Sequence, residues 1–157
     1  MHAHYHTTSK LSRKIGPRSA VIKGLLESLV LYESIETTES KAKAIKPVFD
    51  RLVTRAKRGG LHDIRRIHAD LGSKVAAEKL TQELVHGFQS RPSGYTSLIA
   101  TGYRRGDAAP MVKVSLLLDD DFEDKIKKIQ AEKVAVAKDT KKTAKPVAKE
   151  TAKEKKQ

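Results

Sequence analysis

The sequence has 157 residues, a length typical of one domain, and its 32 Lys and Arg against 19 Asp and Glu give a formal net charge of +13. It contains no Cys, which excludes disulfide frameworks, thiolate metal sites and cysteine nucleophiles. No apolar run approaches the roughly 18 residues that cross a bilayer, and the first residues lack the apolar stretch of a secretory signal. We therefore expect a soluble, cytoplasmic protein without a membrane partner.

The N-terminal end is basic before any acidic residue occurs. Five cationic residues precede Glu27, the first acidic one; they are Lys10, Arg13, Lys14, Arg18 and Lys23. A segment of this charge repels itself and is attracted to a polyanion, although a solvated tail is the alternative interpretation. We assign residues 1–18 to a basic, extended N-terminal arm that binds nucleic acid.

The C-terminal end differs in kind. Residues 122–157 are a mixture dominated by Lys, Ala, Glu, Thr and Val, without Gly and with no aromatic residue after Phe122. Such a segment cannot bury enough apolar surface to offset its chain entropy. We expect a disordered or partly helical extension there, and a globular domain over residues 19–121.

The first half of this domain predicts two helices around a short strand. Ser19 is a candidate N-cap for a helix ending near Glu33, and the β-branched residues 34–38 predict a strand. Thr38 then caps a longer helix with one apolar face, which ends at Gly59. Pro47 lies opposite that face, where it should bend the helix.

The second half predicts two further helices and two strands. Residues 61–71 form the third helical pattern, and a fourth runs from Ser73 to Phe88 with Val75 on its buried side. Residues 95–101 and 112–118 predict strands. The expected fold is α+β, with two layers in which about four helices pack on a small mixed sheet of about three strands.

Catalytic or metal-binding patterns are weak. His2, His4 and His6 alternate but have no second ligand cluster, and His62 and His68 do not share a helix face. The glycines after Ala100 fit neither a P-loop nor a dinucleotide fingerprint. We expect no catalytic residue, no cofactor and no small-molecule substrate. A small enzyme that uses His62 or His68 is retained only as a minor alternative.

Two turns combine arginine with an aromatic ring. Residues 91–95 and 102–106 each contain Arg, Tyr and Gly within one short turn. Arg offers a planar fork to phosphate, and Tyr can stack on an unpaired base. For Tyr95 and Tyr103, core packing at a strand end is an equal alternative.

Short blocks of sequence resemble a known family, the bacterial large-subunit ribosomal protein seventeen. The blocks are Leu11-Ser12-Arg13, Arg18-Ser19-Ala20, Ser28-Leu29-Val30, Ile35-Glu36-Thr37-Thr38, Lys41-Ala42-Lys43, Ala56-Lys57-Arg58-Gly59 with Leu61-His62, Gly94-Tyr95-Thr96, and the run from Gly102 to Met111. They cover residues 1 to about 118 in family order. The chain departs from the pattern at Met1-His2-Ala3-His4, where the family has Met-Arg-His-Arg, and at Pro17, where it has His.

The resemblance implies a non-catalytic protein of the large ribosomal subunit that lies against its long rRNA. Its neighbours would be other large-subunit proteins, ribosomal protein thirty-two among them. By the same analogy, the N-terminal arm, the start of the Thr38-capped helix and the two glycine turns face RNA.

We therefore interpret the chain as a structural, rRNA-binding ribosomal protein. The residues expected to bind rRNA are His2, His4, Lys10, Arg13, Lys14, Arg18, Lys23, Lys41, Lys43, Arg58, Arg65, Arg66, Arg91, Tyr95, Tyr103, Arg104 and Arg105. A DNA-binding architectural protein, suggested by the same charge and by the Lys/Ala-rich extension, is the alternative function.

Overall fold

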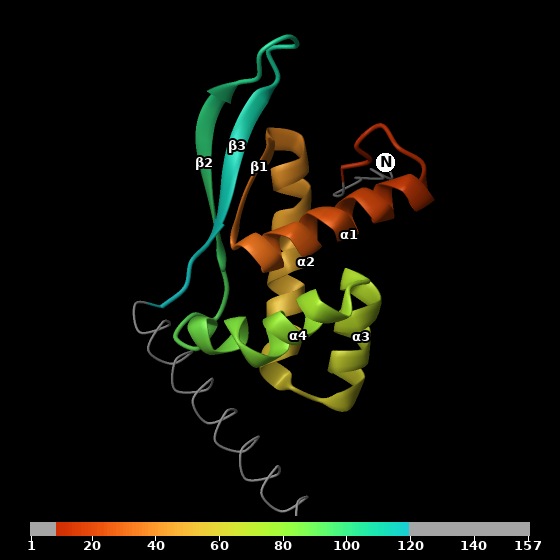
Figure 1. Cartoon of the computed structure of the whole chain (residues 1–157), viewed down its shortest axis with the longest axis vertical. Coiled ribbons are helices and arrows are strands. Elements are labelled where there is room, and N and C mark those ends of the chain that lie inside the picture. Colours follow the sequence, from red (N-terminus) through yellow and green to blue (C-terminus); the bar gives the residue numbers. More distant parts are fainter. Residues whose placement is uncertain (1–8, 120–157) are drawn as a thin grey trace, which may run out of the picture. The chain divides into compact units, whose positions relative to one another are not determined.

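The computed structural model describes residues 9–119 of the chain (Figure 1). Its elements, in chain order, are α1 (Ile15–Tyr32), β1 (Ser34–Thr38), α2 (Glu39–Arg58), α3 (Leu61–Leu71), α4 (Lys74–Gln82), a 3-10 helix (Leu84–Phe88), β2 (Thr96–Tyr103) and β3 (Pro110–Leu116). His2, His4 and the predicted C-terminal extension lie outside the described residues.

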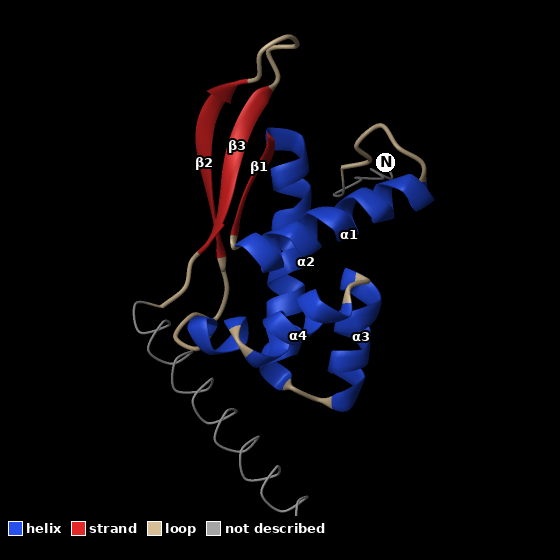
Figure 2. Ribbon diagram, in the orientation of Figure 1, coloured by secondary structure: helices blue, strands red, loops and turns tan. Residues whose placement is uncertain are grey.

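The three strands form one sheet in the order β1-β3-β2. The α+β class is confirmed, but the sheet is antiparallel throughout and not mixed. Strands β2 and β3 are joined by a short hairpin, which requires antiparallel pairing, and β1 pairs with β3 from Ser34↔Ser115 to Thr38↔Met111. Figure 2 shows the β2–β3 hairpin extending beyond the N-terminal end of α2.

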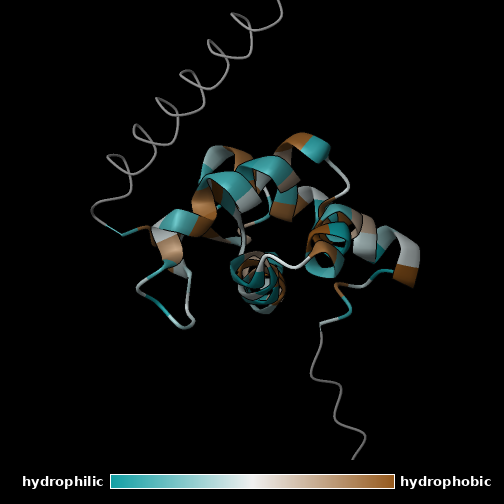
Figure 3. Ribbon diagram, turned by 90° about the horizontal axis from the view of Figure 1, so that it is seen from below, coloured by the Kyte–Doolittle hydropathy of each residue, from teal (hydrophilic) through white to brown (hydrophobic). Residues whose placement is uncertain are grey.

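The core lies between the helices and the sheet. It contains Leu29 of α1, Phe49 of α2 and Val114 of β3, all fully buried. Hydrophobic and hydrophilic residues alternate around the helices, as Figure 3 shows by colour. Helix α2 has one face for the core, with Ile45, Phe49 and Leu52 buried, whereas α1 also exposes large apolar residues, among them Ile15 and Tyr32.

Helix α1 begins earlier than the sequence pattern predicts. Its N-cap is Lys14, and Ser19 donates a hydrogen bond to the carbonyl oxygen of Gly16 instead of capping the helix. Pro17 is tolerated because the N–H groups of a first helical turn have no intrahelical acceptor. Residues 15–18 consequently belong to α1.

The fourth predicted helix divides into two elements. Helix α4 ends at Gln82, and a 3-10 helix follows. Val75 is 66% exposed, because α4 buries Ala76, Ala77 and Leu80 on a face centred about 150° away from it. The prediction that Val75 is buried was therefore wrong.

Candidate nucleic-acid interface

A row of three hollows follows the N-terminal segment and the gap between α1 and α2. The first, of about 550 Å³, is lined by Lys10 and Arg13 of the N-terminal segment and by Thr38 and Lys41 at the start of α2. Its lining is mostly polar, which suits a hydrated anionic ligand better than an apolar one.

The second hollow, of about 370 Å³, shares Ser9 with the first. Its cationic lining comes from Arg18 of α1 and from Lys43 and Arg51 of α2. One amine in this hollow is already engaged, because Lys43 forms an ion pair of 2.5 Å with Glu39 on the same helix.

The third hollow, of about 340 Å³, shares Arg51 with the second and reaches α3. Its charged lining consists of Lys23, Arg51, Arg55, Arg66 and Asp70. Because adjacent hollows share residues, the three form one continuous surface, which we call the α1–α2 groove. Asp70 is the only acidic side chain that lines it in the described part of the chain.

The N-terminus of α2 opens into the first hollow. Thr38 is the N-cap, as predicted, but its side chain accepts no capping hydrogen bond from the helix. The first N–H groups of a helix and the positive end of its dipole favour a bound anion. A phosphate here would meet these N–H groups together with the amine of Lys41.

The tip of the β2–β3 hairpin presents a second basic surface. Tyr103 is 78% exposed, and both arginines of the tip are exposed. Arg104 binds Asp107 with two hydrogen bonds, Nε at 3.0 Å and Nη2 at 2.6 Å. No hydrogen bond or ion pair engages Arg105 among residues 9–119, so its guanidinium is available to a ligand.

The same contacts perturb Asp107. The hydrogen bond from Arg104, followed by that from the backbone N–H of Ala109, lowers the pKa of Asp107 to about 2. The pKa of Arg104 is raised by the same pair. The carboxylate therefore stays charged at neutral pH, and it holds Arg104 to the turn.

The turn before β2 is built differently. Tyr95 is fully buried, its ring packs edge-on against Phe88 at 5.1 Å between centroids, and its hydroxyl donates to the carbonyl oxygen of Pro92 at 2.8 Å. The predicted base stacking by Tyr95 is wrong, because the ring has no exposed face. Arg91 is half-buried and pairs with Asp119 at 3.9 Å.

Other predicted residues lie apart from the groove. Arg58, at the end of α2, and Arg65 on α3 are exposed but line none of the three hollows. Lys14, the N-cap of α1, is exposed next to the first hollow in sequence.

Arg51 and Arg55 were missed by sequence reasoning. Both line the groove. A signal did exist: Lys43, Arg51 and Arg55 recur at multiples of four residues, which places them along one side of a helix. That this side of α2 borders a groove becomes clear only from the structure, in which α1 lies next to it.

The described residues also lack features of other protein classes. They contain no group of three or more His, Cys, Asp or Glu able to hold a metal ion. No helix among them is long and apolar enough to span a membrane. The described residues thus form a small, basic α+β domain with groups of cations in one groove and at one hairpin tip.

Comparison with known proteins identifies the family. The family model "Ribosomal protein L17" matches residues 21–117. The large ribosomal subunit protein bL17 of Gemmatimonas aurantiaca is 40% identical over 115 residues, covering 73% of this chain and 98% of the relative. That of Coprothermobacter proteolyticus is 44% identical over 101 residues, covering 64% and 86% respectively. The chain belongs to the ribosomal protein L17 family, whose members are structural components of the ribosome and not enzymes.

Proposed function

We propose that this protein binds and stabilises 23S-type rRNA as a structural constituent of the large ribosomal subunit in the cytoplasm. Family membership supports the ribosomal role over that of a DNA-binding architectural protein, since the relatives carry the name of a large-subunit protein. The rRNA contact itself rests on the geometry of this chain.

The observation that supports it most strongly is the α1–α2 groove. Nine lysine and arginine side chains line its three hollows, against the single carboxylate of Asp70. Such an excess of cations in one continuous depression repels other cations and attracts a polyanion. The sugar–phosphate backbone of RNA is the polyanion available in a ribosomal subunit.

The mechanism is the neutralisation of phosphates where RNA segments converge. The groove follows one stretch of backbone, the N-terminus of α2 adds N–H donors, and the hairpin tip reaches a second RNA segment with Arg105 and Tyr103. The family resemblance adds neighbouring large-subunit proteins, with ribosomal protein thirty-two among the expected contacts.

A salt titration of binding tests the electrostatic claim. The full chain is mixed with in vitro transcribed 23S-type rRNA, and affinity is measured by filter binding over a range of KCl concentrations. With six to ten phosphates engaged, the logarithm of affinity should fall against the logarithm of salt concentration with a slope of roughly −0.7 to −0.9 per phosphate. A flat dependence would contradict the proposal.

Sedimentation tests the ribosomal location. In a sucrose gradient of cell lysate, the protein should migrate with the large subunit and leave it only at high salt. Migration with free DNA, with none in the large-subunit fractions, would instead support the architectural function.

A further inference from the structure

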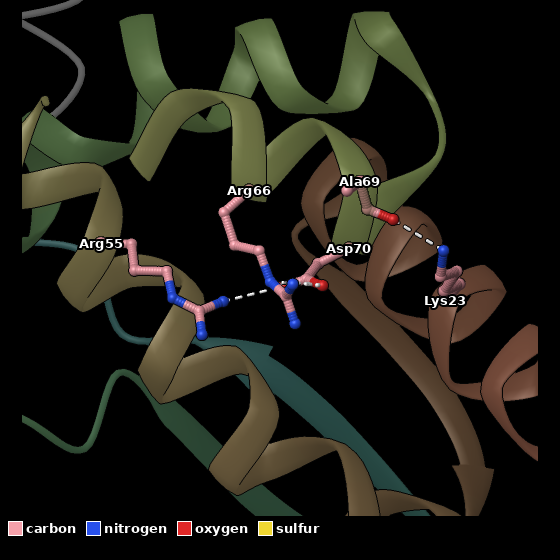
Figure 4. Close-up of polar contacts among 5 residues, drawn as sticks. All are labelled: Lys23, Arg55, Arg66, Ala69 and Asp70. Carbon is pink, nitrogen blue, oxygen red and sulfur yellow. Dashed lines mark hydrogen bonds and ion pairs between the residues drawn. The ribbon is translucent and has the colours of Figure 1, made fainter. Parts of the chain in front are cut away.

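Three helices converge at the inner end of the α1–α2 groove, where the side chains form a charged cluster (Figure 4). Arg55 of α2 and Arg66 of α3 both reach the carboxylate of Asp70. The distances are 2.6 Å from Nη1 of Arg55 to Oδ2 and 3.4 Å from Nε of Arg66 to Oδ1. From α1, Lys23 donates from Nζ to the carbonyl oxygen of Ala69 at 2.6 Å.

The two arginines keep donors that Asp70 does not use. A guanidinium carries five N–H groups, and these ion pairs join Asp70 to one nitrogen of each arginine. Both side chains also remain accessible, Arg55 at 29% and Arg66 at 58% exposure. The carboxylate of Asp70 therefore holds the guanidinium groups of Arg55 and Arg66 in place, while part of each guanidinium faces the groove.

The cluster contains more cationic side chains than are needed to neutralise the carboxylate of Asp70. One arginine would suffice to neutralise Asp70, yet two contact it, and Lys23 and Arg51 line the same hollow. Arg51 is exposed and has no hydrogen bond or ion pair in the described part of the chain. The cluster thus carries a net positive charge in a concave place, which favours an anion with several acceptor oxygens.

We propose that Arg51, Arg55 and Arg66 form a phosphate-binding clamp for one phosphodiester group of rRNA, and that Asp70 is its positioning residue. Arg matches phosphate oxygens with paired N–H donors, and it stays charged at every physiological pH. Asp70 fixes the directions of two guanidinium groups before the ligand arrives, so less side-chain freedom is lost on binding. This inference rests on the proposed function.

Replacing Asp70 by Asn separates positioning from charge. D70N removes a negative charge from the groove, so binding governed by net charge would become tighter. A clamp that depends on the Asp70 contacts would instead bind the 23S-type transcript about threefold more weakly. The measurement is filter binding of the full chain at one fixed salt concentration, with thermal unfolding showing that D70N is folded. Equal or tighter binding by folded D70N would overturn the positioning role.

Replacing Arg51 by Ala tests the clamp without touching Asp70. Because Arg51 has no partner among the described residues, R51A should fold normally and bind the transcript about tenfold more weakly. Its salt slope should be shallower by roughly 0.7 to 0.9, the value of one lost phosphate contact. K74A is the matched control: Lys74 is an exposed cation of α4 that lines no part of the groove, and its loss should leave the slope unchanged.

The outcomes distinguish this inference from the proposed function. If wild-type protein binds rRNA with a steep salt dependence but R51A retains the full slope, the clamp is wrong and the rRNA-binding role stands. If the wild-type protein shows a flat salt dependence, the proposed function fails and the clamp fails with it.

Discussion

Tyr95 and Tyr103 both follow a glycine at an end of β2, yet the structure gives them opposite surroundings. Tyr95 is enclosed by Phe88 and the helices, whereas Tyr103 lies at the free end of the hairpin. The ring of Tyr95 contributes to stability, and the ring of Tyr103 is available to a base.

Alanine at each tyrosine should separate these roles. Tyr95→Ala should lower the free energy of unfolding by about 3–5 kcal/mol, because it removes a fully buried ring. Tyr103→Ala should change it by less than about 0.5 kcal/mol, while rRNA affinity falls by about 1–3 kcal/mol if the ring stacks on a base. Urea denaturation and filter binding measure the two effects. Unchanged rRNA affinity of Tyr103→Ala would remove this ring from the interface.

The local sequence does not predict which tyrosine is buried, since each occurs in a Gly-Tyr pair with an arginine within four residues. What separates them is which end of β2 meets the helices, a property of the tertiary fold. The same holds for Arg104 and Arg105: only the structure shows that Asp107 engages the first. The cationic character of both turns, in contrast, was readable from the sequence.

At the scale of elements, two glycines of the helices have opposite backbone requirements. Gly59 ends α2 with φ of 67°, a conformation that side chains with a Cβ adopt at a cost. Gly24 lies inside α1, and a Cβ added there would meet no atom within 4 Å.

Alanine should therefore act in opposite directions at these positions. Gly59→Ala should destabilise the protein by about 1–2 kcal/mol, since it forces a left-handed residue to carry a Cβ. Gly24→Ala should stabilise it by about 0.5–1 kcal/mol, through helix propensity and the reduced entropy of the unfolded chain. Chemical denaturation checks both values. A destabilising Gly24→Ala would show that the α1 surface is more crowded than the structure indicates.

The hairpin tip should respond to acid. The pKa of Asp107 is lowered from 3.8 to about 2 in the folded protein, so its contacts stabilise the tip fully above pH 3.8 and are lost as the pH falls through 2. NMR titration of the Ala109 amide, which donates to Asp107, should show a midpoint near pH 2. In Asp107→Asn this transition should be absent. A midpoint near 3.8 in the wild type would mean that Arg104 does not hold the carboxylate.

Hydrophobic patterns predicted the existence and order of the helices and strands, because each element buries some apolar residues in the core. These patterns did not predict the start of α1, which depends on backbone hydrogen bonding. Pro17 falls within a first turn that needs no N–H donor, so α1 starts four residues before Ser19. The predicted mixed sheet was wrong, because the direction of pairing depends on partners that are far apart in sequence, such as Ser34 and Ser115.

At the scale of the whole molecule, the excess positive charge is distributed unevenly along the chain. Residues 1–118 contain 20 of the 32 basic and 10 of the 19 acidic residues, so they carry +10 of the net charge of +13. Composition alone indicates a polyanion partner. It does not predict the groove, because the groove exists only where α1, α2 and the N-terminal segment meet.

The groove also explains why the predicted basic residues are not equivalent. Lys10, Arg18 and Lys41 come from three separate segments, yet the fold brings them to one surface. Arg58 and Arg65 have the same charge but lie elsewhere, so we expect their loss to weaken rRNA binding less than the loss of a groove residue.

The central claim is that the α1–α2 groove binds the rRNA backbone. A cryo-EM structure of the large subunit containing this chain tests it most directly. We expect phosphate groups of 23S-type rRNA along the groove, at hydrogen-bonding distance of about 2.7–3.2 Å from its lysine and arginine nitrogens. A groove that faces solvent or another protein, with the rRNA bound elsewhere on the surface, would contradict the account.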